Sequence, residues 1–245
     1  FFDAPAGNLP VQWALYAAPQ DFYIPGYQVG AIDYGWMQAF HFPSFGGSLG
    51  IQVAQGASET APNGTLTLEF PTLPENSAVN PRLRQHYTLE VVAADESGLP
   101  VAARASLFAN PAEFYIGLRP DNWIGQAQVE SGFEVQLVDW TKQPAGAHPL
   151  RAVFQKVVWE RIEGSTIFES PQYEPVYTLI ASTDFTTNDQ GLARIAFTPP
   201  EPGTYQLTVE GEGASSDLML WVGGTGQAVW PNLPNQRLRL TADKE

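Results

Sequence analysis

Apolar and polar residues alternate along much of this 245-residue chain with the period of two that β-strands produce. The clearest stretch is residues 204–210, TYQLTVE, in which Tyr205, Leu207 and Val209 alternate with polar side chains. Such alternation predicts a strand with one buried face and one face in water. No segment of ten residues shows the 3.6-residue period of an amphipathic helix. We therefore expect an all-β chain built from antiparallel β-sandwiches.

The strand–turn–strand pattern occurs twice, at a spacing of about 120 residues. In each copy a glycine turn precedes the first strand, because a hairpin turn needs a positive φ. A longer loop in the first copy accounts for a change of offset between the two strands, and surface loops tolerate such insertions. The matched positions, first copy against second, are Gly64, Leu68, Phe70, Tyr87, Leu89 and Val91 against Gly191, Ile195, Phe197, Tyr205, Leu207 and Val209.

The repeat predicts the domain organisation. We expect a first sandwich over residues 1–110 with one or more N-terminal strands missing, because the chain opens in strand-like sequence. A second sandwich should cover residues 111–224, and residues 225–245 should form a linker and the start of a third module. On this interpretation the chain is a fragment of a longer protein.

Charge and composition exclude several classes of partner. The net charge is −14, from 26 acidic and 12 basic residues, and such a chain repels nucleic-acid phosphates and anionic lipid. No apolar run approaches the length of a membrane span, so we expect no nucleic-acid partner and no direct membrane insertion. The absence of cysteine excludes disulfides, thiolate metal sites and cysteine nucleophiles within this stretch.

Residues capable of chemistry are scattered. His41, His86 and His148 fall in three separate loop or strand-edge contexts, whereas a metal site needs convergent ligands. The acids of the segments 95–96 and 184–189 suit turns better than a calcium loop. No nucleophile elbow, zinc-protease or phosphate-loop motif occurs. We therefore expect no catalytic residue, no bound cofactor and no metal site, so the chain is not predicted to be an enzyme.

An aromatic-rich stretch extends from Phe22 to Phe45. One interpretation is a long hairpin that packs on the sandwich or on a neighbouring module, and this is the one we favour. The other is an exposed platform for sugar or protein, since Tyr and Trp offer large contact areas. Together with the FYIGL segment, this stretch supplies the residues expected at inter-module or partner contacts: Tyr34, Trp36, Phe40, Phe42, Phe45, Phe114 and Tyr115.

Four motifs, taken in order, resemble the macroglobulin-like domains of bacterial α2-macroglobulins. They are NPAEFYIGLRPDNW, the DQG and FTPPEPGTY pair, LMLWVGG, and the terminal RLRLTADKE; FFDAPAGNLPVQW is similar to a mid-module strand pair. The resemblance implies tandem immunoglobulin-like sandwiches immediately before a bait-region domain. In immunoglobulin-like folds the position of Tyr205 belongs to a tyrosine whose hydroxyl ties down the corner before its strand.

The resemblance also implies a function. Members of this family are protease traps, and their thioester needs a cysteine that this stretch lacks. Target proteases and neighbouring domains are the implied partners, in the periplasm or outside the cell, with the parent protein anchored by lipid in some cases. This stretch would be scaffold, rigid where FYIGL packs near Ala109–Ala112. The alternatives are a surface adhesion or glycan-binding array and an accessory module of a large extracellular enzyme.

Overall fold

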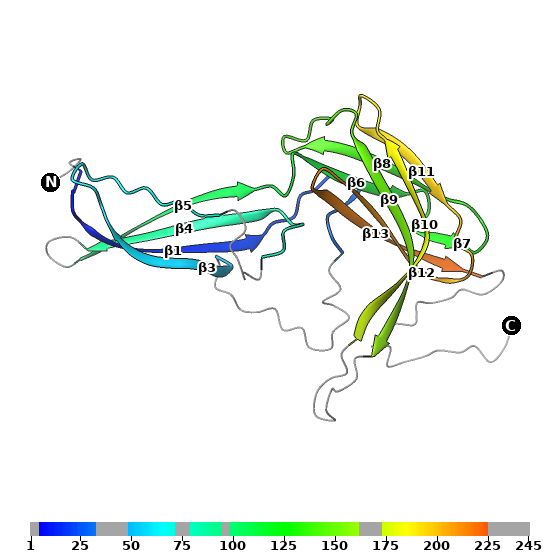
Figure 1. Ribbon diagram of the computed structural model, residues 1–245, viewed down its shortest axis with the longest axis horizontal. Coiled ribbons are helices and arrows are strands. Elements are labelled where there is room, and N and C mark those ends of the chain that lie inside the picture. The colour runs from blue at the N-terminus through cyan, green and yellow to red at the C-terminus, as the bar shows by residue number, and fades with distance from the viewer. Residues whose placement is uncertain (1–4, 33–48, 72–78, 95–98, 162–172, 225–245) are drawn as a thin grey trace. The chain divides into compact units, whose positions relative to one another are not determined.

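The computed structural model describes residues 5–32, 49–71, 79–94, 99–161 and 173–224 (Figure 1). Within these ranges the chain is all-β, as predicted, and no helix there is long and apolar enough to cross a membrane. The strands are β1 Pro10–Pro19, β2 Gln28–Val29, β3 Ile51–Glu59, β4 Gln85–Ala94, β5 Pro100–Ala109, β6 Phe114–Pro120, β7 Ile124–Gln126, β8 Ser131–Asp139, β9 Pro149–Arg161, β10 Tyr173–Thr186, β11 Leu192–Phe197, β12 Gly203–Gly211 and β13 Ala214–Gly223.

The chain divides into two compact units. Unit 1 contains Phe1–Asp21 and Ser44–Pro111, and unit 2 contains Phe22–Pro43 and Ala112–Glu245. This grouping differs from the expected modules at Phe22–Pro43, which sequence position assigned to the first module. The described part of that segment belongs with unit 2 because β2 pairs with β6. The division into modules 1–110, 111–224 and 225–245 otherwise stays a prediction.

Unit 1 contains one antiparallel sheet of four strands among its described residues, in the order β3-β1-β4-β5. Leu15, Ala17 and Tyr87 form its buried centre. The expected strand at Gly64–Phe70 is not a strand in the structure, although Phe70 packs edge-on against Trp13 at 5.1 Å between ring centroids. A strand needs a ladder partner, and the described part of unit 1 offers none to this segment.

Unit 2 is a sandwich of two sheets, with orders β11-β8-β6-β2 and β10-β9-β12-β13-β7. Inward-facing side chains of both sheets form one continuous core. At its centre Phe154 stacks on Phe197 and on Tyr205, with ring centroids 5.2 and 5.1 Å apart. Alternate positions of β8 and β12 supply this core, as the period-two pattern of the sequence predicts.

The two copies of the repeat have equivalent strand orders. The order β3-β1-β4-β5 in unit 1 corresponds to β10-β9-β12-β13 in unit 2. The matched tyrosines also take equivalent register positions: Tyr87 faces Leu107 on β5, and Tyr205 faces Leu220 on β13. The duplication seen in the sequence is therefore a duplication of a four-stranded sheet.

The expected turn and corner chemistry is present. Gly64 and Gly191 have φ values of 79° and 71°, and each donates its N–H to the carbonyl three residues earlier at 2.8 Å. The Tyr205 hydroxyl donates a hydrogen bond of 2.7 Å to the backbone oxygen of Glu201. This bond fixes the loop before β12, as the resemblance to immunoglobulin-like folds implied.

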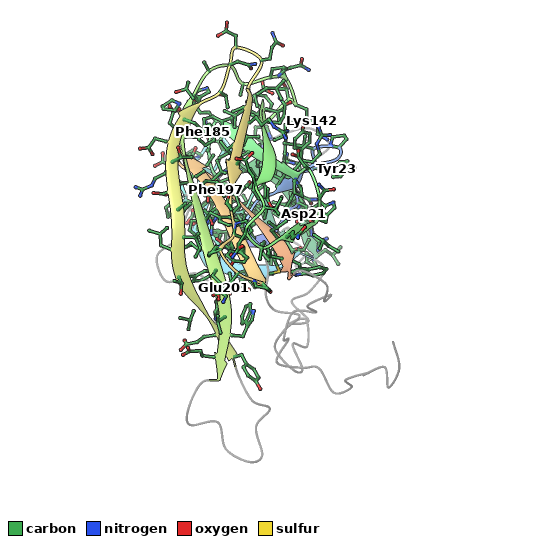
Figure 2. The ribbon with its side chains drawn as sticks, turned by 90° about the vertical axis from the view of Figure 1, so that its right-hand side faces the viewer. Asp21, Tyr23, Lys142, Phe185, Phe197 and Glu201 are labelled. Carbon is green, nitrogen blue, oxygen red and sulfur yellow. The ribbon has the colours of Figure 1, made fainter. Side chains whose placement is uncertain are left out.

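The β9–β10 hairpin extends beyond the rest of its sheet. Pairing of β9 with β12 stops at Val157, whereas pairing with β10 continues to Arg161. Figure 2 shows the ribbon of β9 and β10 continuing past the level of Glu201. Apolar side chains on it, including Val176 and Leu179, are exposed.

Candidate interaction site at the sheet edges of unit 2

The predicted contact residues fall into two groups. Tyr34, Trp36, Phe40, Phe42 and Phe45 lie outside the described residues. Phe114 and Tyr115 lie on β6 in unit 2.

Phe114 and Tyr115 are both buried within their own unit, at 2% and 6% exposure. Phe114 belongs to the sandwich core, whereas Tyr115 faces the opposite side of β6. This differs from the expected packing of FYIGL at the junction of two modules. The physical reason is that β6 is covered on both faces within unit 2.

The outer face of β6 is covered by Phe22–Ile32, which we call the strap. The strap is the described start of the aromatic stretch. Phe22 lies flat on Tyr115, with centroids 3.7 Å apart and an interplanar angle of 1°, and Ile24 is buried beside them. Tyr23, between the two, is 64% exposed and lies on the same side of unit 2 as Lys142 in Figure 2. From Phe22 to Ile24, alternation therefore places every second side chain on the sheet.

The strap turns after Ile24 and joins the sheet edge. The Tyr27 N–H donates to the Ile24 carbonyl at 3.1 Å, and Gly26 adopts a φ of 80° that favours glycine in this turn. Gln28 and Val29 then pair with Leu118 and Gly117 as the edge strand of the sheet.

The other sheet is reached by the next residues of the strap. The Asp217 N–H on β13 donates to the Gly30 carbonyl at 2.9 Å, and the Gly30 N–H donates to the Ser216 hydroxyl at 2.8 Å. Ser216 in turn donates to the Ile116 carbonyl of β6 at 2.6 Å. The strap therefore covers the edge of β6 and the part of β13 that β7 does not reach.

A polar group anchors the middle of the strap. The Tyr27 hydroxyl donates a hydrogen bond to one carboxylate oxygen of Glu134. Arg119 donates to the other at 2.7 Å, and its guanidinium lies 4.9 Å from the centre of the Tyr27 ring. Burial and the hydrogen bond to Glu134 raise the pKa of Tyr27 to about 12. The hydrogen bonds from Tyr27 and Arg119 hold the pKa of Glu134 below its usual range.

These shifts predict an alkaline effect. The pKa of Tyr27 in the folded chain is raised to about 12 from 10.0. Its contribution to stability is therefore complete below pH 10.0 and is lost as the pH rises toward 12. Ultraviolet titration of tyrosinate should show one phenol with a pKa near 12 that is missing in Tyr27→Phe. A difference curve between the two proteins centred near the ordinary tyrosine pKa would contradict the assignment.

Within the described ranges, the remaining ionisable groups do not converge on a reaction centre. His148 Nδ1 lies 3.0 Å from a Glu212 carboxylate oxygen, and His86 packs against the Phe108 ring. His41 lies outside the described residues. Among the residues that the structure describes, no three histidine, cysteine, aspartate or glutamate side chains are grouped so that they could hold a metal ion.

One groove adjoins the strap. It has a volume of about 350 Å³ and is lined by Gln28, Ile32, Trp123, Met219 and Trp221. Trp123 and Trp221 are 57% and 41% exposed, so two large aromatic surfaces are open to solvent beside it. The sequence did not single out either tryptophan, because neither stands in an aromatic-rich run.

The four-stranded sheet present in both units, and the two-sheet sandwich that contains it in unit 2, define the class of this protein: an all-β protein of immunoglobulin-like modules. No family model matches the chain. Over 168 residues, 65% of the chain, it is 29% identical to the alpha-2-macroglobulin homolog of Nostoc, of which it spans 9%. The resemblance to bacterial alpha-2-macroglobulins seen in the sequence motifs is thus confirmed.

Solved structures show the same fold. The chain matches Escherichia coli alpha-2-macroglobulin in its native conformation with a TM-score of 0.55 and 17% identity, over 91% of this chain and 14% of that one. It matches the same protein activated by porcine elastase with a TM-score of 0.52 and 16% identity, over 90% and 19% of the two chains. The chain spans less than a fifth of each of these relatives.

Proposed function

We propose that this chain is a scaffold segment of a bacterial alpha-2-macroglobulin-like, broad-spectrum protease inhibitor. It positions the bait region and passes on the effect of bait cleavage as rigid-body motion. It is not itself catalytic. The parent protein works in the periplasm or outside the cell, with a lipid anchor in some cases, and its partners are target proteases and neighbouring macroglobulin-like domains.

The observation that supports this proposal most strongly is the match to the Nostoc homolog over 168 residues. The structure of unit 2 is consistent with a mechanical role. Its core residues Phe133, Phe154 and Leu207 are fully buried, and tightly packed interiors transmit displacement rather than deform. The relative from E. coli has been solved both in a native and in an elastase-activated form.

The test uses the full-length parent and elastase. After incubation with the parent, elastase should cleave a protein substrate at least about tenfold more slowly, because trapped elastase no longer reaches that substrate. Hydrogen exchange of the parent, measured before and after cleavage, should show unchanged protection for β8 and β12. Elastase with a blocked active-site serine is the control for the exchange measurement, because it cannot cut the parent and any change of exchange that it causes does not come from cleavage. Undiminished cleavage of the protein substrate would contradict the proposal that the parent inhibits proteases. Lost protection in β12 would contradict the proposal that unit 2 moves as a rigid body.

A glycan-binding array is the second candidate. The exposed Trp123 and Trp221 beside the groove are the feature that favours it, whereas the aromatics Tyr34 to Phe45 lie outside the described residues. A change of tryptophan fluorescence on adding oligosaccharides would support this candidate, and unchanged fluorescence would support the scaffold.

A further inference from the structure

We propose that the edge of β6 and the part of β13 that β7 does not reach form a binding site for one extended segment, the strap Phe22–Ile32, and that the strap is a detachable latch. Displacement of unit 1 pulls on this latch and opens the edges of both sheets of unit 2. The part of this inference that concerns bait cleavage rests on the proposed function. The binding site and its detachment do not.

The first argument is the path of the chain. Asp21 and the residues from Ser44 onward belong to unit 1, whereas Phe22–Pro43 belongs to unit 2. The strap is therefore tied to unit 1 through its neighbours in the chain, although its own contacts are with unit 2. Displacement of unit 1 acts on unit 2 through its chain links, which include the one from Asp21 to the strap and the short one from Ala109 to β6, so the strap receives part of any such pull.

The second argument is the small extent of the attachment. In the part of the chain that the structure describes, only Gln28 and Val29 of this segment form a ladder with β6, whereas β12 pairs with β13 from Gly203 to Gly211. The strap supplies side chains to the outer face of the sheet and none to the sandwich core. The strap can therefore separate from the sheet while the core of unit 2 stays packed, as in a local unfolding event.

The third argument is the specificity of the site. Tyr115 receives the Phe22 ring, Glu134 accepts the Tyr27 hydroxyl, and Ser216 bridges Gly30 to β6. Contacts of this kind recognise an extended peptide by its main-chain hydrogen bonds and by alternate side chains, as in β-strand addition.

Gly117 shows that the surface is shaped for the strap. A Cβ at this position would lie 3.0 Å from the Tyr27 Cβ and 3.1 Å from the Ile24 Cδ1. Its neighbours on β6, Ile116 and Leu118, point into the core, so a side chain at position 117 would press on the strap and not on the core. Gly117 therefore leaves no side chain on the outer face of β6 at the place where the strap crosses it.

Detachment would leave two kinds of unpaired group. The N–H of Asp217 would lose its acceptor, the Gly30 carbonyl, and the Ser216 hydroxyl would lose the Gly30 N–H. The edge of β6 would lose its pairing with Gln28 and Val29. Open sheet edges of this kind pair readily with another extended segment, so release of the latch would turn unit 2 from a closed sandwich into a surface that accepts a strand.

Hydrogen exchange by NMR on this 245-residue chain tests the latch directly. In Gly117→Val we expect the amides of Gly30 and Asp217 to exchange at least about tenfold faster than in the unmodified chain, whereas the Leu207 amide stays unchanged. The control is Ala196→Val on β11, an exposed position, which should change none of the three. Should Gly117→Val fail to fold, Tyr27→Ala is measured in the same way.

Two results would overturn the latch. One is an equal acceleration at Gly30, Asp217 and Leu207, because the strap would then open only together with the core. The other is no acceleration at Gly30 and Asp217 in either variant. In the full-length parent, the same two amides should exchange faster after elastase cleavage. Inhibition of elastase without this change would refute the coupling and leave the proposed function standing, whereas absence of inhibition would refute the function alone.

Discussion

Replacement of Phe154 by alanine is expected to lower the free energy of unfolding of unit 2 by about 3–5 kcal/mol. The side chain is fully buried and stacks on Phe197 and Tyr205. Removing its ring therefore opens a cavity in the middle of the core that surrounding side chains can fill only in part. Urea unfolding followed by circular dichroism gives the change directly.

The matched control for this prediction is Leu179→Ala on the neighbouring strand β10. Leu179 is 60% exposed, so its truncation should change the free energy of unfolding by less than about 0.5 kcal/mol. Comparable losses for Phe154→Ala and Leu179→Ala would mean that the core of unit 2 does not lie between its two sheets.

The turn before β11 gives the second large effect. Gly191 has a φ of 71°, and a Cβ there would lie 2.6 Å from the Leu137 carbonyl oxygen. We expect Gly191→Ala to cost about 1–2 kcal/mol from the left-handed backbone. Crowding against the rigid strand β8 adds a further 1–3 kcal/mol, roughly the cost of overpacking. The measurement is again the free energy of unfolding in urea.

Gly146 separates the two contributions. Its φ is also 71°, but no heavy atom lies within 4 Å of its hypothetical Cβ. Gly146→Ala should therefore cost only the backbone part, about 1–2 kcal/mol. If Gly191→Ala and Gly146→Ala lower the free energy of unfolding equally, the close approach of Gly191 to β8 does not add to the cost of the substitution.

The latch and the rigid sandwich are complementary features of one mechanical part. The core of unit 2 resists deformation because its aromatic side chains are stacked between two sheets. The strap is attached by a short ladder and a few polar contacts at the periphery. A scaffold that transmits cleavage of a distant segment needs both a body that keeps its shape and an attachment that can be released.

Local sequence patterns predicted much of the fold. The alternation of Tyr205, Leu207 and Val209 is the buried face of β12, and Gly64 and Gly191 take the positive φ that their turns require. These features are readable because they depend on a residue and its immediate neighbours. The resemblance to alpha-2-macroglobulins was also readable, because its motifs are turn and strand residues in a fixed order.

Contacts between distant segments were not predicted. The sequence placed Phe22 in an aromatic stretch, but nothing in that stretch shows that its partner is Tyr115. The pattern at Gly64–Phe70 resembles β11, yet it forms no strand because no described neighbour pairs with it. Pairing depends on which segment is present to supply the ladder, and a local pattern carries no information about that.

By itself the sequence determined an acidic chain without cysteine, an all-β fold, and a sheet present in two copies. These follow from side-chain chemistry and from periodicity, which act over a few residues. Only the tertiary structure decided that Phe22–Ile32 leaves the first unit and closes the edges of β6 and β13 in the second. The reason is that an open sheet edge accepts any extended segment whose side chains fit its face, and that fit exists only after both sheets have formed.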